Sequence, residues 1–188
     1  YSVVAINSNT FLMCEDVTGV TIPRTIERIG VGAFSVNEAE TDFTTLRISD
    51  LEAWCNIDFE AGSSNPMSHA EYIYLNDILI SDLAIPEGVK EIKSYAFAMY
   101  NNPINVIIPN SVESIGDNAF YYCRGLNSVT IGNSVKSIGS SAFYYCSGLQ
   151  EVYCYAEQIP STESNAFSGA SVANATLHVT AASIDSYK

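Results

Sequence analysis

The sequence repeats itself every 23 residues, and this period strongly limits the folds that the chain can adopt. Residues 103–125 and 126–148 align without gaps and match at 14 of 23 positions. Residues 80–102 and 17–39 keep the same frame, and a further copy with one extra residue begins at Leu149. A period of about 20–50 residues is typical of proteins built from stacked units that contact only their neighbours. We therefore expect an array of stacked repeats.

Each repeat begins with a strand pattern. Apolar and polar residues alternate in residues 129–131, as in a strand with one buried face, and Pro109 or Gly132 then ends the strand. The pattern V-x-x-I-G-x-x-A-F follows, and its three- and four-residue spacings predict a loose helical turn. The expected core contains the phenylalanines of this pattern, Phe34, Phe97, Phe120, Phe143 and Phe167. The inward strand positions are Val20, Ile22, Leu83, Ile85, Val106, Ile108, Val129, Ile131, Val152, Cys154, Leu177 and Val179.

Residues 40–79 interrupt this register. We expect a ladder strand at Thr45–Ser49 with Leu46 and Ile48 facing inward. Two apolar runs, 72–75 and 78–80, flank Asn76-Asp77 and predict a small hairpin. The segment is either a protruding binding element or a long structural repeat whose Trp54 fills the core. We favour the second interpretation, because large aromatic side chains usually pack.

Composition and charge exclude several classes of protein. Apolar residues make up 47% and charged residues 15%, which favours a packed core over disorder. The net charge of −13 argues against nucleic acid or an anionic membrane surface as a partner. No apolar run is long enough to cross a bilayer. The chain begins at Tyr1 without a signal peptide, so we interpret it as a mature or trimmed fragment.

The five cysteines do not form a recognisable framework. Their number is odd and no CxxC pair occurs, so neither a closed set of disulfides nor a zinc site is supported. Cys123 and Cys146 occupy the same repeat position, which favours a core-filling role. A bridge between these two successive turns is the alternative in an oxidising compartment.

The recurring pattern VTIPxSVxxIGxxAFxxCxGL resembles the BspA-like leucine-rich repeats of bacterial surface and secreted proteins, typical of Bacteroidetes. Residues 49–55, SDLEAWC, resemble an insert that recurs in these arrays. The resemblance implies an α/β repeat solenoid, a right-handed array with a parallel β-ladder on one face and short helical turns and loops on the other. We expect a single domain over residues 1–188, with repeats at about 17–39, 80–102, 103–125, 126–148 and 149–172, an irregular long repeat at 40–79 and a truncated C-terminal strand in 173–188. An extracellular or cell-surface location is also implied.

No arrangement of residues indicates catalysis. The carboxylate pairs Asp50 with Glu52, Asp58 with Glu60 and Asp77 with Asp82 lie in no distinctive motif. Neither histidine, His69 or His178, has a nucleophile or a metal ligand at a diagnostic spacing. The family that the sequence resembles has no shared catalytic residues. We predict a protein that is not an enzyme and that uses no cofactor and no metal.

The outward strand side chains form the candidate binding site. One expected column runs from Thr21 to His178 over about seven strands, roughly 30 Å. The candidate ligand-binding residues are Asn105, Ile107, Ser128, Thr130, Glu151, Tyr153, Tyr155 and His178. This face predicts protein–protein interaction or adhesion, with a host or bacterial surface protein, including extracellular matrix, as the partner. The alternatives are a glycan-binding module that uses the same tyrosines, or a structural spacer that presents another domain. A second aromatic set is interpreted as packing or ladder residues, namely Tyr121, Tyr122, Tyr144 and Tyr145.

Overall fold

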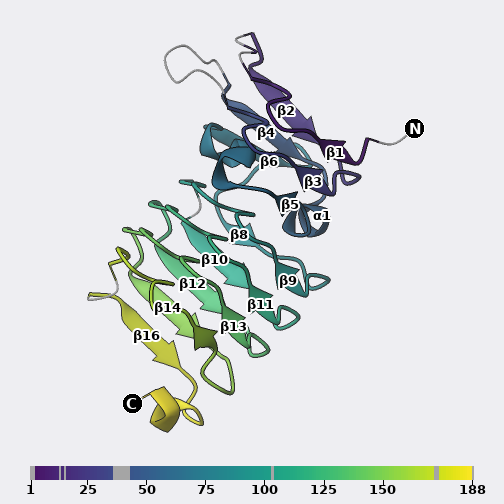
Figure 1. The fold of residues 1–188 in the computed structure, drawn as a ribbon. Helices are drawn as coiled ribbons and strands as arrows, with labels where there is room; N and C mark the ends of the chain where they lie inside the picture. Colours follow the sequence, from purple (N-terminus) through teal and green to yellow (C-terminus); the bar gives the residue numbers. More distant parts are fainter. Residues whose placement is uncertain are drawn as a thin grey trace.

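The computed structural model describes residues 3–12, 14, 16–35, 43–102, 104–171 and 174–187. The chain winds into a β-solenoid with two strand ladders, and β1 and β16 lie near opposite ends of the stack (Figure 1). The main ladder contains β2 (Gly19–Ile22), β4 (Thr45–Ile48), β6 (Tyr72–Leu75), β8 (Leu83–Ala84), β10 (Asn105–Ile108), β12 (Ser128–Ile131), β14 (Glu151–Cys154) and β16 (Thr176–Val179). The second ladder contains β1 (Ala5–Ile6), β3 (Arg28–Ile29), β5 (Asp58–Phe59), β9 (Glu91–Ile92), β11 (Ser114–Ile115), β13 (Ser137–Ile138) and β15 (Ser161–Thr162).

The 23-residue period sets the register of both ladders. Val106 pairs with Val129 in the main ladder, and Ile115 pairs with Ile138 in the second ladder, both in parallel. Because side chains alternate along a strand, equal register places the apolar residues of every turn on the same inner side. All four of these side chains are buried. The repeats predicted from the sequence therefore stack in the expected order.

The segment predicted to be a helical turn is different in the structure. Each copy of V-x-x-I-G-x-x-A-F contains a two-residue strand of the second ladder, followed by tight turns. The backbone here donates to the next repeat, as Phe120 N does to the carbonyl of Ala142 at 2.8 Å. Asn118 and Tyr122 adopt left-handed φ values of 56° and 58°, which an α-helix does not accommodate. Hydrogen bonds between repeats thus replace those within a helix, and the only α-helix among the described residues is α1 (Leu51–Cys55).

A column of stacked phenylalanine rings fills the core. The ring centroids of Phe97 and Phe120 lie 5.3 Å apart, those of Phe120 and Phe143 5.1 Å, and those of Phe143 and Phe167 4.9 Å. Phe97, Phe120 and Phe143 are fully buried, and Phe167 is partly exposed. The core role expected for this repeat position is confirmed for these rings.

Cys123 and Cys146 are also fully buried, as expected. Their thiols donate to the carbonyls of Phe97 and Phe120 at 3.1 and 3.2 Å, one repeat earlier. No disulfide joins Cys123 to Cys146 in the structure. The two cysteines therefore act as small core residues that also hold successive repeats together.

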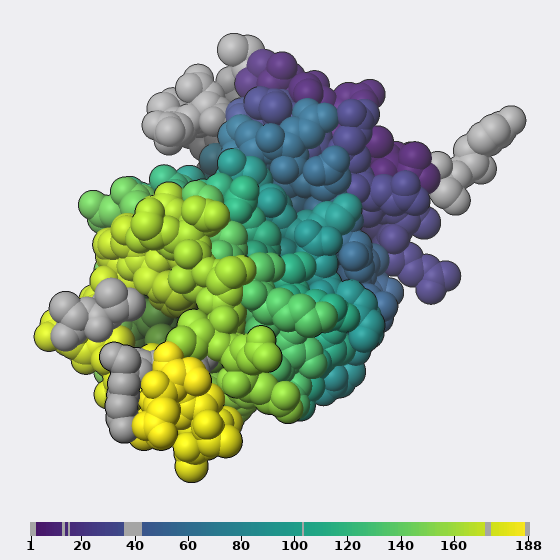
Figure 2. Space-filling model, turned by 60° about the horizontal axis from the view of Figure 1, so that its bottom comes forward, coloured from purple at the N-terminus to yellow at the C-terminus, as the bar shows by residue number. Residues whose placement is uncertain are grey.

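Inward strand positions at the two ends of the main ladder are less buried than expected. Leu177 of β16 is 51% exposed, although its equivalents in the preceding strands, Val129 and Val152, are 0% and 8% exposed. β16 is the last strand of its sheet, and Figure 2 views this end of the array, with the yellow C-terminal residues in front. Val20 of β2, at the other edge of the main ladder, is partly exposed. Both lie where the stack of described strands stops, so burial requires a neighbour on each side.

The first turn of the second ladder was missed by the sequence analysis. β1 pairs in parallel with β3, and the Phe11 ring stacks on Phe34 with centroids 5.1 Å apart. Ile6 and Phe11 are five residues apart, as are Ile29 and Phe34. This spacing was the available signal, but Thr10 replaces the alanine that marks the other copies.

The interruption contains strands that join the main ladder. β4 lies where the sequence predicts it, with Leu46 and Ile48 buried. β6 adds a parallel strand beside β4, and β7 (Ile78–Leu79) returns antiparallel to it, which confirms the hairpin. β7 runs antiparallel to β6 and does not pair with β8. The main ladder is therefore divided into a sheet β2-β4-β6-β7 and a sheet β16-β14-β12-β10-β8. The expected continuous face of about seven strands is therefore wrong.

Buried side chains join the two halves across this break. In a regular repeat the alanine carbonyl accepts the N–H of the preceding repeat's phenylalanine, as Ala119 does from Phe97 at 2.8 Å. The Ala96 carbonyl instead accepts Trp54 Nε1 at 2.8 Å and Asn65 Nδ2 at 3.0 Å. Trp54 is 1% exposed and Asn65 is fully buried. The structural interpretation of Trp54 is confirmed: it packs in the core and replaces a missing ladder hydrogen bond.

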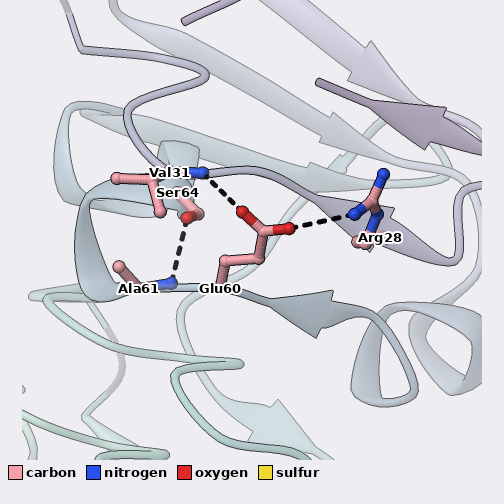
Figure 3. Close-up of polar contacts among 5 residues, drawn as sticks. All are labelled: Arg28, Val31, Glu60, Ala61 and Ser64. Carbon is pink, nitrogen blue, oxygen red and sulfur yellow. Dashed lines mark hydrogen bonds and ion pairs between the residues drawn. The ribbon is translucent and has the colours of Figure 1, made fainter. Parts of the chain in front are cut away.

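The loop after β5 is tied to the preceding repeat by polar contacts (Figure 3). Glu60 accepts from Arg28 Nη1 at 3.1 Å and from the Val31 N–H at 3.2 Å. The Ala61 N–H donates to Ser64 Oγ at 3.1 Å, where the short 3₁₀ turns η1 (Gly62–Ser64) and η2 (Pro66–Ser68) begin. These contacts fix the approach of the loop that delivers Asn65 to the core.

Candidate binding site

The five-stranded sheet brings seven of the eight candidate residues onto one outward surface, which we call the sheet face. Register aligns Asn105, Ser128 and Glu151 in one column. A second column contains Ile107, Thr130, Tyr153 and His178. Side chains two residues apart on a strand point to the same side, so the two columns lie next to each other.

The polar column is tied together by its own hydrogen bonds. Asn105 Nδ2 donates to Asp82 Oδ1 at 2.9 Å, and Ser128 Oγ donates to Asn105 Oδ1 at 2.6 Å. These side chains therefore have fixed orientations on the sheet before any partner binds. Fixed orientation reduces the conformational entropy that a side chain loses on association.

The second column carries the apolar and aromatic surface. Ile107 is 50% exposed on β10, the strand beside the edge strand β8. The rings of Tyr153 and His178 are stacked, with centroids 4.3 Å apart and an interplanar angle of 7°. His178 Nε2 lies 2.6 Å from Glu151 Oε2. The sequence predicted His178 on the outward face, and the structure adds that it contacts both an aromatic ring and a carboxylate.

Tyr155 lies apart from this cluster. It follows β14, is 46% exposed, and lines a cavity of about 610 Å³ together with Asn133 and Glu157. Tyr155 was predicted as a ligand-binding residue of the outward strand face, but this cavity was not predicted from the sequence. The available signal was the one extra residue that follows Tyr155 in the fifth repeat.

Four of the carboxylates considered for catalysis have structural partners. Asp50 caps α1 by accepting the Ala53 N–H at 3.0 Å, and Asp77 pairs with Arg47 at 2.8 Å. Glu60 and Asp82 accept the hydrogen bonds described above. Among the described residues, no three His, Cys, Asp or Glu side chains are grouped to hold a metal ion. Asp50, Glu60, Asp77 and Asp82 thus have local structural roles.

Burial disfavours the ionised form of two cysteine thiols, those of Cys55 and Cys123. Burial, followed by the nearby carboxylates of Glu52 and Asp50, raises the pKa of the Cys55 thiol. Burial also raises the pKa of the Cys123 thiol well above its ordinary value. Because the thiolate is the reactive form, these two buried cysteines are poor nucleophiles.

The second aromatic set forms a ladder, as the sequence predicted. Tyr121 stacks on Tyr144 with centroids 5.4 Å apart, and Tyr122 stacks on Tyr145 at 4.9 Å. Tyr122 and Tyr145 adopt left-handed φ values of 58° and 55°. Gly169 occupies the equivalent position of the next repeat, and an added Cβ there would meet Tyr145 Cδ2 at 2.5 Å. The tyrosine column therefore ends against a glycine that covers the last ring.

No helix in the described part of the chain is long and apolar enough to cross a membrane. The model of the BspA type leucine rich repeat region matches residues 1–55 and 69–188, in six copies. No curated protein matches the sequence.

Solved structures of bacterial repeat proteins are similar to the chain. A leucine rich cell surface protein from Faecalibacterium prausnitzii A2-165 is 17% identical, with a TM-score of 0.52 over 96% of this chain and 64% of that chain. A leucine-rich repeat protein from Bacteroides ovatus ATCC 8483 is 22% identical, with a TM-score of 0.40 over 96% of this chain and 65% of that chain. The leucine rich repeat protein of T. pallidum is 26% identical, with a TM-score of 0.37 over 80% of this chain and 52% of that chain. The chain thus spans between 52% and 65% of the length of these structures.

Proposed function

The chain belongs to the family with BspA type leucine rich repeats, and we propose that it is a non-catalytic module that binds a protein partner through the sheet face. A repeat fold supplies an extended platform without naming a ligand, so the argument depends on the side chains that the platform carries.

The observation that carries the proposal is the fixed aromatic cluster on the rigid sheet. Tyr153 and His178 stack at 4.3 Å, and Glu151 holds the histidine at 2.6 Å. Ile107, 50% exposed and two strands from Tyr153 in the same column, offers an apolar contact. Aromatic side chains are enriched at interface hot spots, and side chains that are already ordered lose little entropy on binding. The sheet face combines these two properties.

Charge restricts the partner that this face would accept. Glu151 belongs to the polar column and Asp82 is hydrogen-bonded to it, and the whole chain carries a net charge of −13. An acidic partner surface would be repelled, whereas a neutral or basic surface would be attracted at low ionic strength. We infer a host or bacterial surface protein, including extracellular matrix, with a neutral or basic contact patch.

The proposal extends to location and architecture. We infer an extracellular or cell-surface protein that takes part in adhesion, since the F. prausnitzii relative is described as a cell surface protein. We also infer one domain over residues 1–188 with the right-handed winding implied by the family resemblance. One hydrophobic cluster that includes Ile29, Trp54 and Phe143 supports the single domain.

Affinity capture of proteins from host mucosal extract, followed by measurement of the dissociation constant, tests the proposal. Substituting Ile107→Ser and Tyr153→Ala together should weaken binding by about tenfold or more, as expected for hot-spot residues. The matched control is Leu79→Ser with Tyr72→Ala, because these residues are 52% and 42% exposed on the hairpin. Unchanged affinity in a folded sheet-face variant would exclude the sheet face as the binding site.

A further inference from the structure

The fifth repeat loses register between its two strands, and this creates a separate recess. Ile131 pairs with Cys154, an offset of 23 residues, whereas Ser137 pairs with Ser161, an offset of 24. The loop of residues 155–160 therefore spans the same distance as residues 132–136 with one residue more. Residues 132–136 of the preceding repeat offer no position on which the extra residue could stack. Part of the loop must therefore leave the stack.

Burial shows which residues leave the stack. Val135 is 2% exposed, but Ile159, directly before Pro160 and β15, is 49% exposed. Ala156 and Pro160 are buried instead and hold the two ends of the loop against the core. The middle of the loop is thus raised above the preceding turn and anchored on both sides.

Two adjoining cavities lie along this raised loop. The first, about 610 Å³, is lined by Asn110, Asn133, Tyr155, Glu157, Thr180 and Ala182. The second, about 470 Å³, is lined by residues 133–136 and 157–159 together with Glu113. Asn133 and Glu157 line both cavities, so the two lie next to each other, and we call them together the groove. Each volume falls within the range of about 300–1,000 Å³ that is usual for ligand sites.

The side chains of this groove combine an aromatic ring with hydrogen-bonding groups. Tyr155 is 46% exposed at one end. Asn110 Oδ1 accepts the backbone N–H of Asn133 at 2.9 Å, which orients the Asn110 side-chain amide. Among the described residues, the Glu157 carboxylate has no hydrogen-bond or ion-pair partner, unlike Glu113, which pairs with Lys136. An amide can both donate and accept, and a carboxylate accepts.

We propose that this groove binds a neutral oligosaccharide, with a sugar ring stacked on Tyr155 and sugar hydroxyls bound by Asn133 and Glu157. A sugar ring has an apolar C–H face that packs on an aromatic ring, and hydroxyls that donate to carboxylates and accept from amides. Glu157 disfavours sialylated or sulfated sugars, because Lys136, the only cationic side chain among the described residues that line the groove, is paired with Glu113. The groove does not depend on the sheet face, since Ile107 and Tyr153 do not line it.

A glycan array followed by calorimetric titration tests the proposal on the whole chain. The array carries neutral glucose, galactose and mannose oligosaccharides beside sialylated and sulfated ones. Binding of at least one neutral oligosaccharide is expected, and Tyr155→Ala and Glu157→Gln should each lower its affinity by about tenfold or more, which is 1.4 kcal/mol. Tyr72→Ala, at another exposed tyrosine, should leave the affinity unchanged.

A loop exchange keeps the test independent of single side chains. Replacing residues 155–160, YAEQIP, by residues 132–136, GNSVK, restores the regular repeat length and should remove glycan binding while the array stays folded. The absence of any neutral glycan signal, binding only to anionic glycans, or binding that survives the loop exchange would each overturn the proposal. Binding of a peptide that these changes abolish, with no binding of any glycan, would also overturn the proposal. None of these outcomes bears on protein binding at the sheet face.

Discussion

The junction between the two halves of the array provides the sharpest test of how this fold is held together. Asn65 donates through Nδ2 to the carbonyls of Tyr95 at 2.7 Å and Ala96 at 3.0 Å, and its Oδ1 accepts the Met67 N–H at 2.9 Å. The Tyr95 carbonyl also accepts the Ala98 N–H, and the Ala96 carbonyl also accepts Trp54 Nε1. Asn65→Ala therefore leaves the buried Met67 N–H without a partner and removes one of two donors from each carbonyl.

The magnitude follows from these contacts. A buried donor left unsatisfied costs about 1–3 kcal/mol, and loss of a hydrogen bond at a carbonyl that keeps another donor adds about 0.5 kcal/mol each. We expect Asn65→Ala to lower the free energy of unfolding by about 2–4 kcal/mol. Trp54→Phe removes the other donor to Ala96, so the double variant leaves that carbonyl unsatisfied. The double variant should then lose about 1–3 kcal/mol more than the sum of the single variants.

Urea denaturation of the four proteins of this double-mutant cycle, followed by circular dichroism, measures both quantities. Fluorescence of Trp54, the only tryptophan, checks in the wild type and Asn65→Ala that both halves unfold together, because repeat arrays can unfold in parts. Asn105→Ala is the matched control, since its amide also joins two repeats but on the exposed sheet face, and should cost under about 1 kcal/mol. A loss below about 1 kcal/mol for Asn65→Ala, or additivity within about 0.5 kcal/mol, would refute the assigned bridging role.

Three further outcomes are expected. Phe120→Ala removes a fully buried ring from the middle of the stack and should lower the free energy of unfolding by about 3–5 kcal/mol in urea titrations. Asn118 has a φ of 56°, so Asn118→Ala should be about 1 kcal/mol less stable than Asn118→Gly. The hydrogen bond and charge of Lys136 lower the pKa of Glu113. NMR titration should show this lowering in the wild type and a return toward the ordinary value in Lys136→Gln.

The sign of the pH effect follows from that shift. The folded pKa of Glu113 is depressed, so its stabilising contribution is present above the unfolded pKa of about 4.3 and is lost as pH falls through the lower folded pKa. An unchanged Glu113 pKa in Lys136→Gln would contradict the assigned cause. For the other two variants, equal stability of the alanine and glycine variants at 118, or a loss below about 1 kcal/mol for Phe120→Ala, would contradict the proposed strain and packing.

Much of the sheet face could be predicted from the sequence, because period-two alternation and a fixed repeat length leave little choice of register. Both predict that Ile107, Thr130 and Tyr153 fall in one outward column, and the structure has them there. The stacking of His178 on Tyr153 and its contact with Glu151 could not be predicted, because they depend on rotamers on three strands. The groove beside Tyr155 could not be predicted, because the presence of one added residue does not determine which side chains leave the stack.

The sequence by itself determined the solenoid, since each unit has an apolar face that only another copy can bury. It also identified the phenylalanine core and the structural role of Trp54. Only the tertiary structure decided that the V-x-x-I-G-x-x-A-F segments form a second ladder, because their backbone groups bond to neighbouring repeats rather than within a helix. It likewise decided that β7 divides the main ladder and that Asn65 joins the halves. Local pattern fixes which side of the chain is buried, whereas the partners of its polar groups depend on contacts between distant residues.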